Sequence, residues 1–247
     1  KNTAPGPDCI SKTDMRKKDV HAWVILYNAM LWSAVTPKRL RESRTSLLHK
    51  KNDRKDPKNW RPITISSIIV RTLHKILAER MYNAVDLADG QRGFCNIDGT
   101  MINSTQLEIF LRESRQSLST HCVASIDVQA AFDSVDHKSI GNALSRMGIE
   151  DQMIRYIMEH YRGLTTSIYC GKQDFGQFSI SSGVKQGDPL SPILFNCVLD
   201  KFTSSLPNDI GGTVAGKKIS VLAFADDLLF LSNSPAAMQM MLDLLGK

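Results

Sequence analysis

The chain has 247 residues, of which 42% are hydrophobic, and its 31 Lys and Arg exceed its 25 Asp and Glu to give a net charge of +6. This composition excludes an intrinsically disordered chain and suffices for one large core or two lobes. No apolar run reaches membrane-spanning length, so we expect no membrane partner. The five cysteines are scattered and form no CxxC pair, which is typical of reduced thiols in an intracellular protein.

The positive charge is concentrated in residues 38–61. This segment has a net charge of +7, which leaves −1 for the rest of the chain. A concentrated basic stretch suits a phosphate backbone or a triphosphate, although a solvated loop is the commoner explanation for an isolated charge run. The basic residues are Lys38, Arg39, Arg41, Arg44, Lys50, Lys51, Arg54, Lys55, Lys58 and Arg61.

Apolar periodicity predicts that the first half of the chain is rich in helices. Helices are expected at residues 14–33, 68–87 and 101–118. The compact apolar run at 122–128 predicts a strand with Asp127 near its end. A loop and then a helix beginning around Asp136 should follow. Asp133 and Asp136 are interpreted as turn and helix-capping residues.

In the second half, strands are predicted at residues 167–170 and 178–184, around a turn at 171–176. The last predicted element is a helix capped by Ser234, with Pro235 in its first turn.

The loop that precedes residue 191 is rich in Gly and Pro. Gly183 and Gly187 allow a backbone to approach a ligand closely, and Gln186 lies between them. Ser191 and Pro192 predict the start of a helix. The loop is therefore able to present Gln186 and backbone N–H groups to a nucleotide or a template base, although an ordinary loop before a helix explains it equally well.

Two adjacent carboxylates interrupt the apolar run of residues 221–231. The pattern predicts two short buried strands with Asp226 and Asp227 at the turn between them. Burying ionised carboxylates costs several kcal/mol each, and no basic residue lies within the run, so a hard divalent cation is the natural partner. An exposed hairpin tip is the alternative. If the strand of Asp127 pairs with this hairpin, three carboxylates converge and can hold two Mg²⁺ ions about 3.5–4 Å apart.

Six ordered blocks of sequence together resemble reverse transcriptases. Asp127 with Ala131-Phe-Asp133, then Gly183-Val-Lys-Gln-Gly-Asp-Pro-Leu-Ser-Pro192, then Ala223-Phe-Ala-Asp-Asp227 resemble motifs A, B and C of that family. Upstream, Ala4-Pro-Gly-Pro-Asp8, Asn59-Trp-Arg-Pro-Ile-Thr64 and Gln91-Arg-Gly-Phe-Cys-Asn-Ile-Asp-Gly-Thr100 resemble its finger motifs. Ordered blocks are far more specific than any single motif. The blocks are most similar to those of non-LTR retrotransposons that insert into ribosomal RNA genes.

The resemblance implies an α+β fold, that of the fingers and palm of a right-hand polymerase, with the antiparallel palm sheet packed on helices and the thumb absent. Fingers are expected at residues 1–95 and 136–182, and palm at 96–135 and 183–247. Relatives continue with a thumb and often an endonuclease, so we expect the chain to be part of a larger polyprotein in the nucleus.

The same resemblance implies an RNA-directed DNA polymerase whose partners are an RNA template, a DNA primer or target and a dNTP. Its cofactor would be Mg²⁺, as two ions, with Mn²⁺ as a substitute. The implied catalytic residues are Asp127, Asp226 and Asp227, and the implied metal-binding residues are these three and Val128. The implied nucleotide-binding residues are Arg61, Lys50, Lys51, Phe132 and Gln186, with Phe132 under the sugar and the basic residues on the phosphates.

Two other interpretations stay open. A group II intron enzyme or another cellular reverse transcriptase resembles the chain in the same motifs, and the associated regions beyond Lys247 would distinguish it. A protein of a different class, a nucleic-acid-binding remnant without catalysis, is the second alternative. The intact acids argue against it.

Overall fold

The computed structural model describes residues 4–50, 53–171 and 173–245, and it forms two compact units. Residues 1–85 and 132–195 make up the first unit, and residues 86–131 and 196–247 make up the second. The chain passes from the first to the second unit for the last time within helix α9 (Ser191–Thr203). The loop at 183–190 thus belongs to the first unit. The assignment of ranges to fingers and palm stays a prediction.

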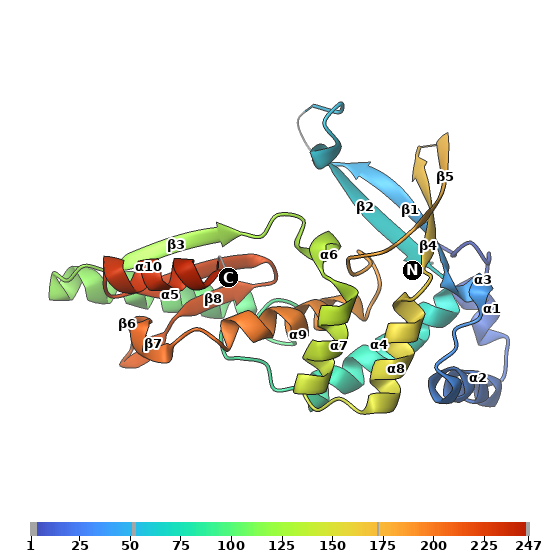
Figure 1. Cartoon of the computed structure of the whole chain (residues 1–247), viewed down its shortest axis with the longest axis horizontal. Coiled ribbons are helices and arrows are strands. Elements are labelled where there is room, and N and C mark those ends of the chain that lie inside the picture. The colour runs from blue at the N-terminus through green and yellow to red at the C-terminus, as the bar shows by residue number, and fades with distance from the viewer. Residues whose placement is uncertain (1–3, 51–52, 172, 246–247) are drawn as a thin grey trace. The chain divides into compact units, whose positions relative to one another are not determined.

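The strands of the first unit form a four-stranded sheet, in the order β2-β1-β4-β5, which extends away from the helices of that unit (Figure 1). Its strands are β1 (Glu42–His49), β2 (Trp60–Ser66), β4 (Thr165–Cys170) and β5 (Gln173–Ser179). The pair β1–β4 is parallel and the other two pairs are antiparallel. We did not predict β1 and β2. The prediction of a strand at 178–184 was wrong in its bounds, because β5 begins at Gln173 and ends at Ser179.

Buried hydroxyl groups explain why hydrophobic alternation did not predict β1 and β2. Thr45 of β1 lies on the buried side of the sheet, and its Oγ1 is 2.8 Å from the Oγ1 atoms of both Thr64 and Thr166. The three hydroxyls satisfy one another, so polar residues occupy positions where an apolar residue would be expected.

Helices account for most of the rest of the first unit. They are α1 (Lys12–Arg16), α2 (Val20–Ser33), α3 (Lys38–Arg41), α4 (Ile68–Ala84), α6 (Ala131–Ser134, which begins at the last residue of the second unit's segment 86–131), α7 (His137–Arg146) and α8 (Asp151–Tyr161), with a short 3-10 helix at Pro57–Asn59. The single helix predicted at 14–33 is two, because Asp19 caps a new helix by accepting a hydrogen bond from the His21 amide. Asp136 caps α7 as predicted, through the Ser139 amide.

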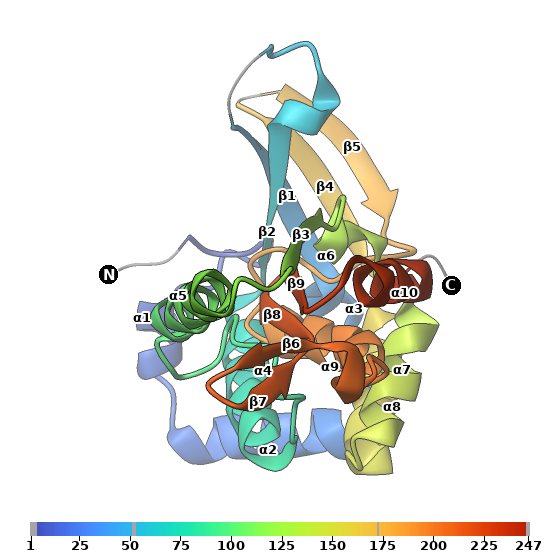
Figure 2. The same cartoon turned by 90° about the vertical axis from the view of Figure 1, so that its left-hand side faces the viewer.

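The second unit is built on a three-stranded antiparallel sheet, in the order β3-β9-β8. Its elements are α5 (Gly99–Ser117), β3 (Cys122–Asp127), a 3-10 helix at Asn208–Ile210, the small hairpin β6 (Gly212–Val214) and β7 (Lys217–Ile219), β8 (Val221–Phe224), β9 (Asp227–Ser232) and α10 (Pro235–Leu245). Figure 2 shows α5 and α10 on opposite sides of this sheet. Ser234 caps α10 through the Ala237 amide, as predicted.

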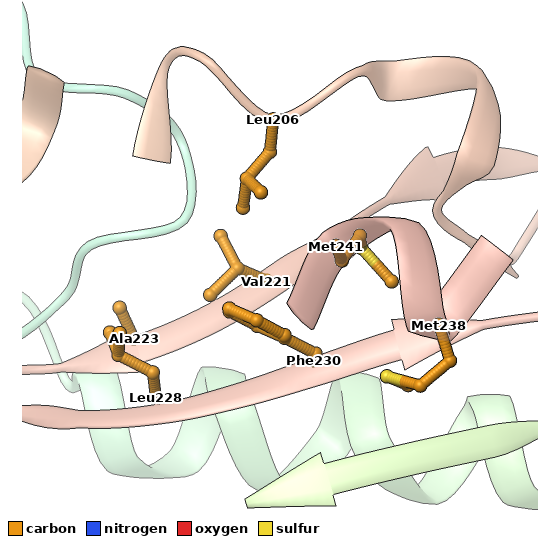
Figure 3. Close-up of a cluster of buried hydrophobic side chains, with 7 residues drawn as sticks. All are labelled: Leu206, Val221, Ala223, Leu228, Phe230, Met238 and Met241. Carbon is orange, nitrogen blue, oxygen red and sulfur yellow. The ribbon is translucent and has the colours of Figure 1, made fainter. Parts of the chain in front are cut away.

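Both faces of this sheet are apolar. On one face Phe230 is fully buried among Val221, Met238 and Met241, as Figure 3 shows. On the other face Leu222 and Leu231 pack with Phe110 of α5. Because side chains alternate along a strand, the two cores together specify the register of β3, β9 and β8.

A buried cluster in the first unit consists of His74 on α4 and of Lys185 and Asp188 in the loop at 183–190. Nδ1 of His74, on α4, is 2.8 Å from both carboxylate oxygens of Asp188, and both side chains are at most 3% exposed. Burial lowers the pKa of Lys185 to about 8, although the charge of Asp188 opposes this shift. Burial raises the pKa of Asp188, but His74, through charge and hydrogen bonding, and the charge of Lys185 outweigh it and hold that pKa well below its ordinary value.

We predict that Asp188→Ala lowers the free energy of unfolding by about 3–5 kcal/mol at pH 7, because it leaves two buried basic groups without their partner. The pKa of Asp188 is lower in the folded state than in the unfolded state. The stabilisation by its carboxylate is therefore complete at pH values above the unfolded-state pKa. It is lost progressively as the pH falls from that pKa toward the folded-state pKa. The deficit of the variant should therefore shrink between pH 5 and pH 3. Urea unfolding at each pH measures it, with Asp151→Asn, an exposed carboxylate on α8, as the control. A deficit that is equal at all pH values would contradict the assignment.

Candidate functional site

Two carboxylates face each other at the end of the β3–β9 ladder. Asp127 is the last residue of β3 and Asp227 the first of β9, and their Cα atoms are direct partners. Side chains of directly opposed residues point to the same face, with Cβ atoms about 4.5–5.5 Å apart. Both residues are exposed. Like charges in this position repel each other, so the arrangement favours a bound cation.

The third carboxylate lies in the turn of the β8–β9 hairpin. Ala225 and Asp226 connect the two strands, so of the two predicted turn residues Asp226 is in the turn and Asp227 begins β9. Asp226 is half-buried. No hydrogen bond or ion pair joins the carboxylates of Asp127, Asp226 and Asp227 to another side chain among the described residues. The predicted pairing of the Asp127 strand with this hairpin is observed, and the convergence of all three acids on a metal stays a prediction.

The oxygen ligands of these acids suit a hard cation, but they do not form a complete coordination sphere by themselves. In the described part of the chain, no three Asp, Glu, His or Cys side chains converge to form a metal centre. Mg²⁺ prefers oxygen ligands and is usually held by one or two carboxylates together with substrate phosphates. The opposed pair Asp127 and Asp227, next to Asp226, supplies such a partial set. The side chain of Val128 packs against the apolar core, so only its main chain is available to a metal.

Gln186 and Asp133 meet in the first unit. Nε2 of Gln186 donates to the two carboxylate oxygens of Asp133, at 3.2 and 3.1 Å. Burial raises the pKa of the Asp133 carboxyl, while the hydrogen bond from Gln186 and the charge of Lys50 oppose this rise. The interpretation of Asp133 as a mere turn or capping residue was therefore incomplete. The structure joins Gln186 to Asp133, and the charge of Lys50 acts on the same carboxylate, whereas sequence reasoning had linked only Gln186 and Lys50 to a nucleotide.

The two glycines of the loop at 183–187 allow other backbone segments of the first unit to pack closely against this loop. A Cβ atom on Gly183 would lie 2.9 Å from the Cα and O atoms of Asp133, and one on Gly187 would lie 2.9 Å from the Thr64 carbonyl oxygen. Both residues also have positive φ, +85° and +112°. Both glycines thus permit close approaches within the unit, and an approach to a ligand stays a prediction.

Phe132 is half-buried and stacks on the buried Phe195, with ring centroids 4.8 Å apart and an interplanar angle of 12°. Its carbonyl oxygen accepts a hydrogen bond from the Val184 amide at 2.7 Å. The residue that follows Ala131 is thus tied to the loop that carries Gln186. One face of the ring is covered, and the role of Phe132 under a sugar stays a prediction.

The predicted phosphate-binding residues lie along the β1–β2 hairpin. Arg61 is exposed on β2 opposite Leu48, and the Lys50 amide continues the ladder by donating to the Asn59 carbonyl. By the alternation of a ladder, Lys50 and Arg61 lie on the same face of the hairpin. Lys51 lies outside the described residues.

A cavity of about 180 Å³ opens beside Gln186 in the first unit. Thr45, Thr64 and Thr166 line one side and the loop at 182–186 lines another. Its volume is below the roughly 300–1,000 Å³ of pockets that enclose a whole small-molecule ligand.

Sequence reasoning missed His74, Lys185 and Asp188 as a unit, and it assigned no functional role to His121 or His137. Both of these histidines are half-buried. Nε2 of His137 lies 3.0 Å from the Gly183 carbonyl oxygen, and His121 packs on Phe110. Lys185 and Asp188 both belong to the motif B block of the sequence. That block is the only signal in the sequence that pointed to their cluster with His74.

The chain matches known proteins over most of its length. A family model described as "Reverse transcriptase (RNA-dependent DNA polymerase)" matches residues 48–247. The "Retrovirus-related Pol polyprotein from type-1 retrotransposable element R2" of Popillia japonica is 42% identical over 243 residues, covering 95% of this chain and 33% of the relative. The "Retrovirus-related Pol polyprotein from type-2 retrotransposable element R2DM" of Drosophila melanogaster is 36% identical over 242 residues, covering 98% and 23%.

The fold also has solved counterparts. The structure of apo telomerase from Candida tropicalis truncated from its C-terminal domain superposes with a TM-score of 0.59 at 13% identity, covering 92% of this chain and 52% of that one. At this identity the likeness supports the fold alone, and it confirms the predicted α+β polymerase class.

The chain spans a third or less of the length of the two retrotransposon relatives described above. The family predicted from the six sequence blocks is confirmed. The chain belongs to the reverse transcriptase family, as a reverse transcriptase domain of the non-LTR retrotransposon kind.

Proposed function

We propose that this chain carries out RNA-directed DNA synthesis, in which a primer 3′-hydroxyl attacks the α-phosphate of a dNTP and pyrophosphate leaves. The observation that carries the proposal is the opposed pair of Asp127 and Asp227 with Asp226 beside it. Membership of the family supports it. A catalytically dead remnant has no need to keep three mutually repelling carboxylates at the end of one ladder.

The acids would hold two Mg²⁺ ions, with Asp127 and Asp226 as main ligands and Asp227 as an auxiliary one. When bound, such ions supply activation of the primer hydroxyl and stabilisation of the leaving pyrophosphate. Phe132 would lie under the sugar, and Gln186, next to its cavity, would contact the nucleotide or template base. Arg61 and Lys50 would bind the phosphates, as would Lys51 by its place in the sequence.

The partners in this proposal are an RNA template, a DNA primer or nicked target and a dNTP, and the place of action is the nucleus. Among the described residues, no helix is both long and apolar enough to cross a membrane.

We predict that Asp127→Asn and Asp226→Asn each abolish primer extension on an RNA template, because the amide keeps the volume and loses the charge that holds Mg²⁺. Without metal, Asp127→Asn should unfold at a slightly higher temperature than the unsubstituted chain, because it relieves repulsion with Asp227. The control is Asp243→Asn, an exposed carboxylate on α10 of the same unit. Near-normal extension by Asp226→Asn would rule out its role as a ligand.

We predict that Phe132→Val raises the incorporation of rNTPs relative to dNTPs, because a ring under the sugar excludes a 2′-hydroxyl. Phe195→Leu disturbs the same ring stack from below and serves as the control. If Phe132 has only a packing role, substitution lowers stability without changing sugar preference, and full truncation to Ala costs about 3–5 kcal/mol. Paired incorporation assays with each nucleotide decide between the two roles.

We predict that RNA binding weakens as salt rises, with a slope of about −0.7 per single-strand phosphate contacted. The double variant Lys50→Gln/Arg61→Gln should reduce the steepness by about 1.4, because it removes two such contacts. Lys75→Gln/Lys138→Gln removes two exposed charges on helices of the same unit and should leave the slope unchanged. Fluorescence anisotropy of a labelled RNA across a salt series measures both. An equal change in the two variants would show that only net charge matters.

A further inference from the structure

The turn before Asp226 has a backbone conformation that its own sequence does not favour. Ala225 has a φ of +57°, in the left-handed region that residues with a Cβ seldom occupy. Such conformations persist only where the surroundings determine them, and they are concentrated at functional sites. Because Asp226 follows directly, whatever holds Ala225 also sets the direction in which Asp226 leaves the turn.

The side chain of Gln91 forms hydrogen bonds with both the amide and the carbonyl group of Ala225. Its Nε2 donates to the Ala225 carbonyl oxygen at 3.0 Å, and its Oε1 accepts from the Ala225 amide at 3.0 Å. The same Oε1 accepts from the Gly93 amide at 2.7 Å. Gln91 is 6% exposed, so these bonds are shielded from water and the geometry of a fixed planar amide is imposed on the turn.

Gly93 closes the other side of the turn. A Cβ atom on Gly93 would lie 2.1 Å from the Ala225 nitrogen and 2.8 Å from its Cα, so only glycine permits this approach. Asn196, fully buried on α9, donates to the Gly93 carbonyl oxygen at 2.9 Å and holds that residue in place. Gln91 and Gly93 therefore act on Ala225 from one short segment that is itself fixed.

The same segment also covers the outer edge of β8. The Ala223 amide donates to the Gly90 carbonyl oxygen at 2.8 Å, and the Ala223 carbonyl oxygen accepts from the Arg92 amide at 3.0 Å. These bonds place Gln91 opposite Ala223, two residues before Ala225. The contact with Ala225 is thus set by backbone pairing and does not depend on a mobile side chain alone.

We propose that Gln91 is a positioning residue for the metal-binding carboxylates, which acts by holding Ala225 in its left-handed conformation so that Asp226 stands beside Asp127 and Asp227. The inference rests on the proposed function in one respect, namely that these acids bind divalent metal. The hydrogen bonds to the turn can be tested without that assumption.

The first test is hydrogen exchange of the Ala225 amide in the 247-residue chain. Gln91→Met keeps the length of the side chain and loses all three hydrogen bonds, so we expect this amide to exchange about tenfold faster or more. The Phe230 amide, within the buried part of β9, should be unchanged. Gln106→Met is the matched control, because the Gln106 amide bonds to Arg92 and not to the turn.

An unchanged Ala225 exchange rate in folded Gln91→Met, or an equal acceleration in Gln106→Met, overturns the proposal. If Gln91→Met does not fold, Gln91→Glu decides. It keeps the acceptor for the Ala225 amide and loses the donor to the Ala225 carbonyl, so exchange should be about threefold faster. An unchanged rate in that variant also overturns the proposal.

The second test measures Mn²⁺ binding to the same chain by the electron paramagnetic resonance of free Mn²⁺. Gln91→Met should weaken Mn²⁺ binding severalfold, Gln106→Met should not, and Asp127→Asn should abolish it. Unaltered binding in Asp127→Asn would refute the metal site of the proposed function. Abolished binding in Asp127→Asn with unaltered binding in Gln91→Met would instead refute the positioning role, since the turn would then be held without consequence for the metal.

Discussion

Repulsion between Asp127 and Asp227 is the constraint on which the second unit depends. The two carboxylates are direct partners across β3 and β9, a position in which like charges destabilise a sheet. A shift of one residue in register would separate them and would also turn Phe230 and Leu231 to the wrong faces. The apolar cores on both faces of the sheet therefore hold the acids together against their charge, and the proposed divalent cation would offset that repulsion.

Buried polar contacts perform a similar task in both units. In the first unit, His74 and Lys185 surround Asp188 and hold the loop that carries Gln186. In the second unit, Gln91 and Asn196 hold the turn that carries Asp226. Gln186 and Asp226 thus each lie on a loop or turn whose conformation is determined by a buried partner from a distant part of the chain. A satisfied buried network is suited to this, because it specifies one geometry where apolar packing tolerates several.

The sequence predicted elements of the fold correctly where an apolar run or a helix-capping residue marked them. The strand ending at Asp127, the helix capped by Asp136 and the helix capped by Ser234 all appear as predicted. Strands β1 and β2 did not follow from pattern, because their buried side chain Thr45 is polar and is satisfied by Thr64 and Thr166 across the sheet. Hydrophobic periodicity cannot detect a strand whose inner face consists of mutually bonded hydroxyls.

The sequence by itself determined the family and the chemistry available to it, because the order of six blocks and the presence of three acids require no coordinates to recognise. Tertiary structure alone decided which groups meet. Gln186 with Asp133, His74 with Asp188 and Gln91 with Ala225 are pairs separated by 53, 114 and 134 positions along the chain. Periods of two or 3.6 residues describe only near neighbours. Contacts at such separations depend on how strands pair and helices pack, and those are properties of the folded chain.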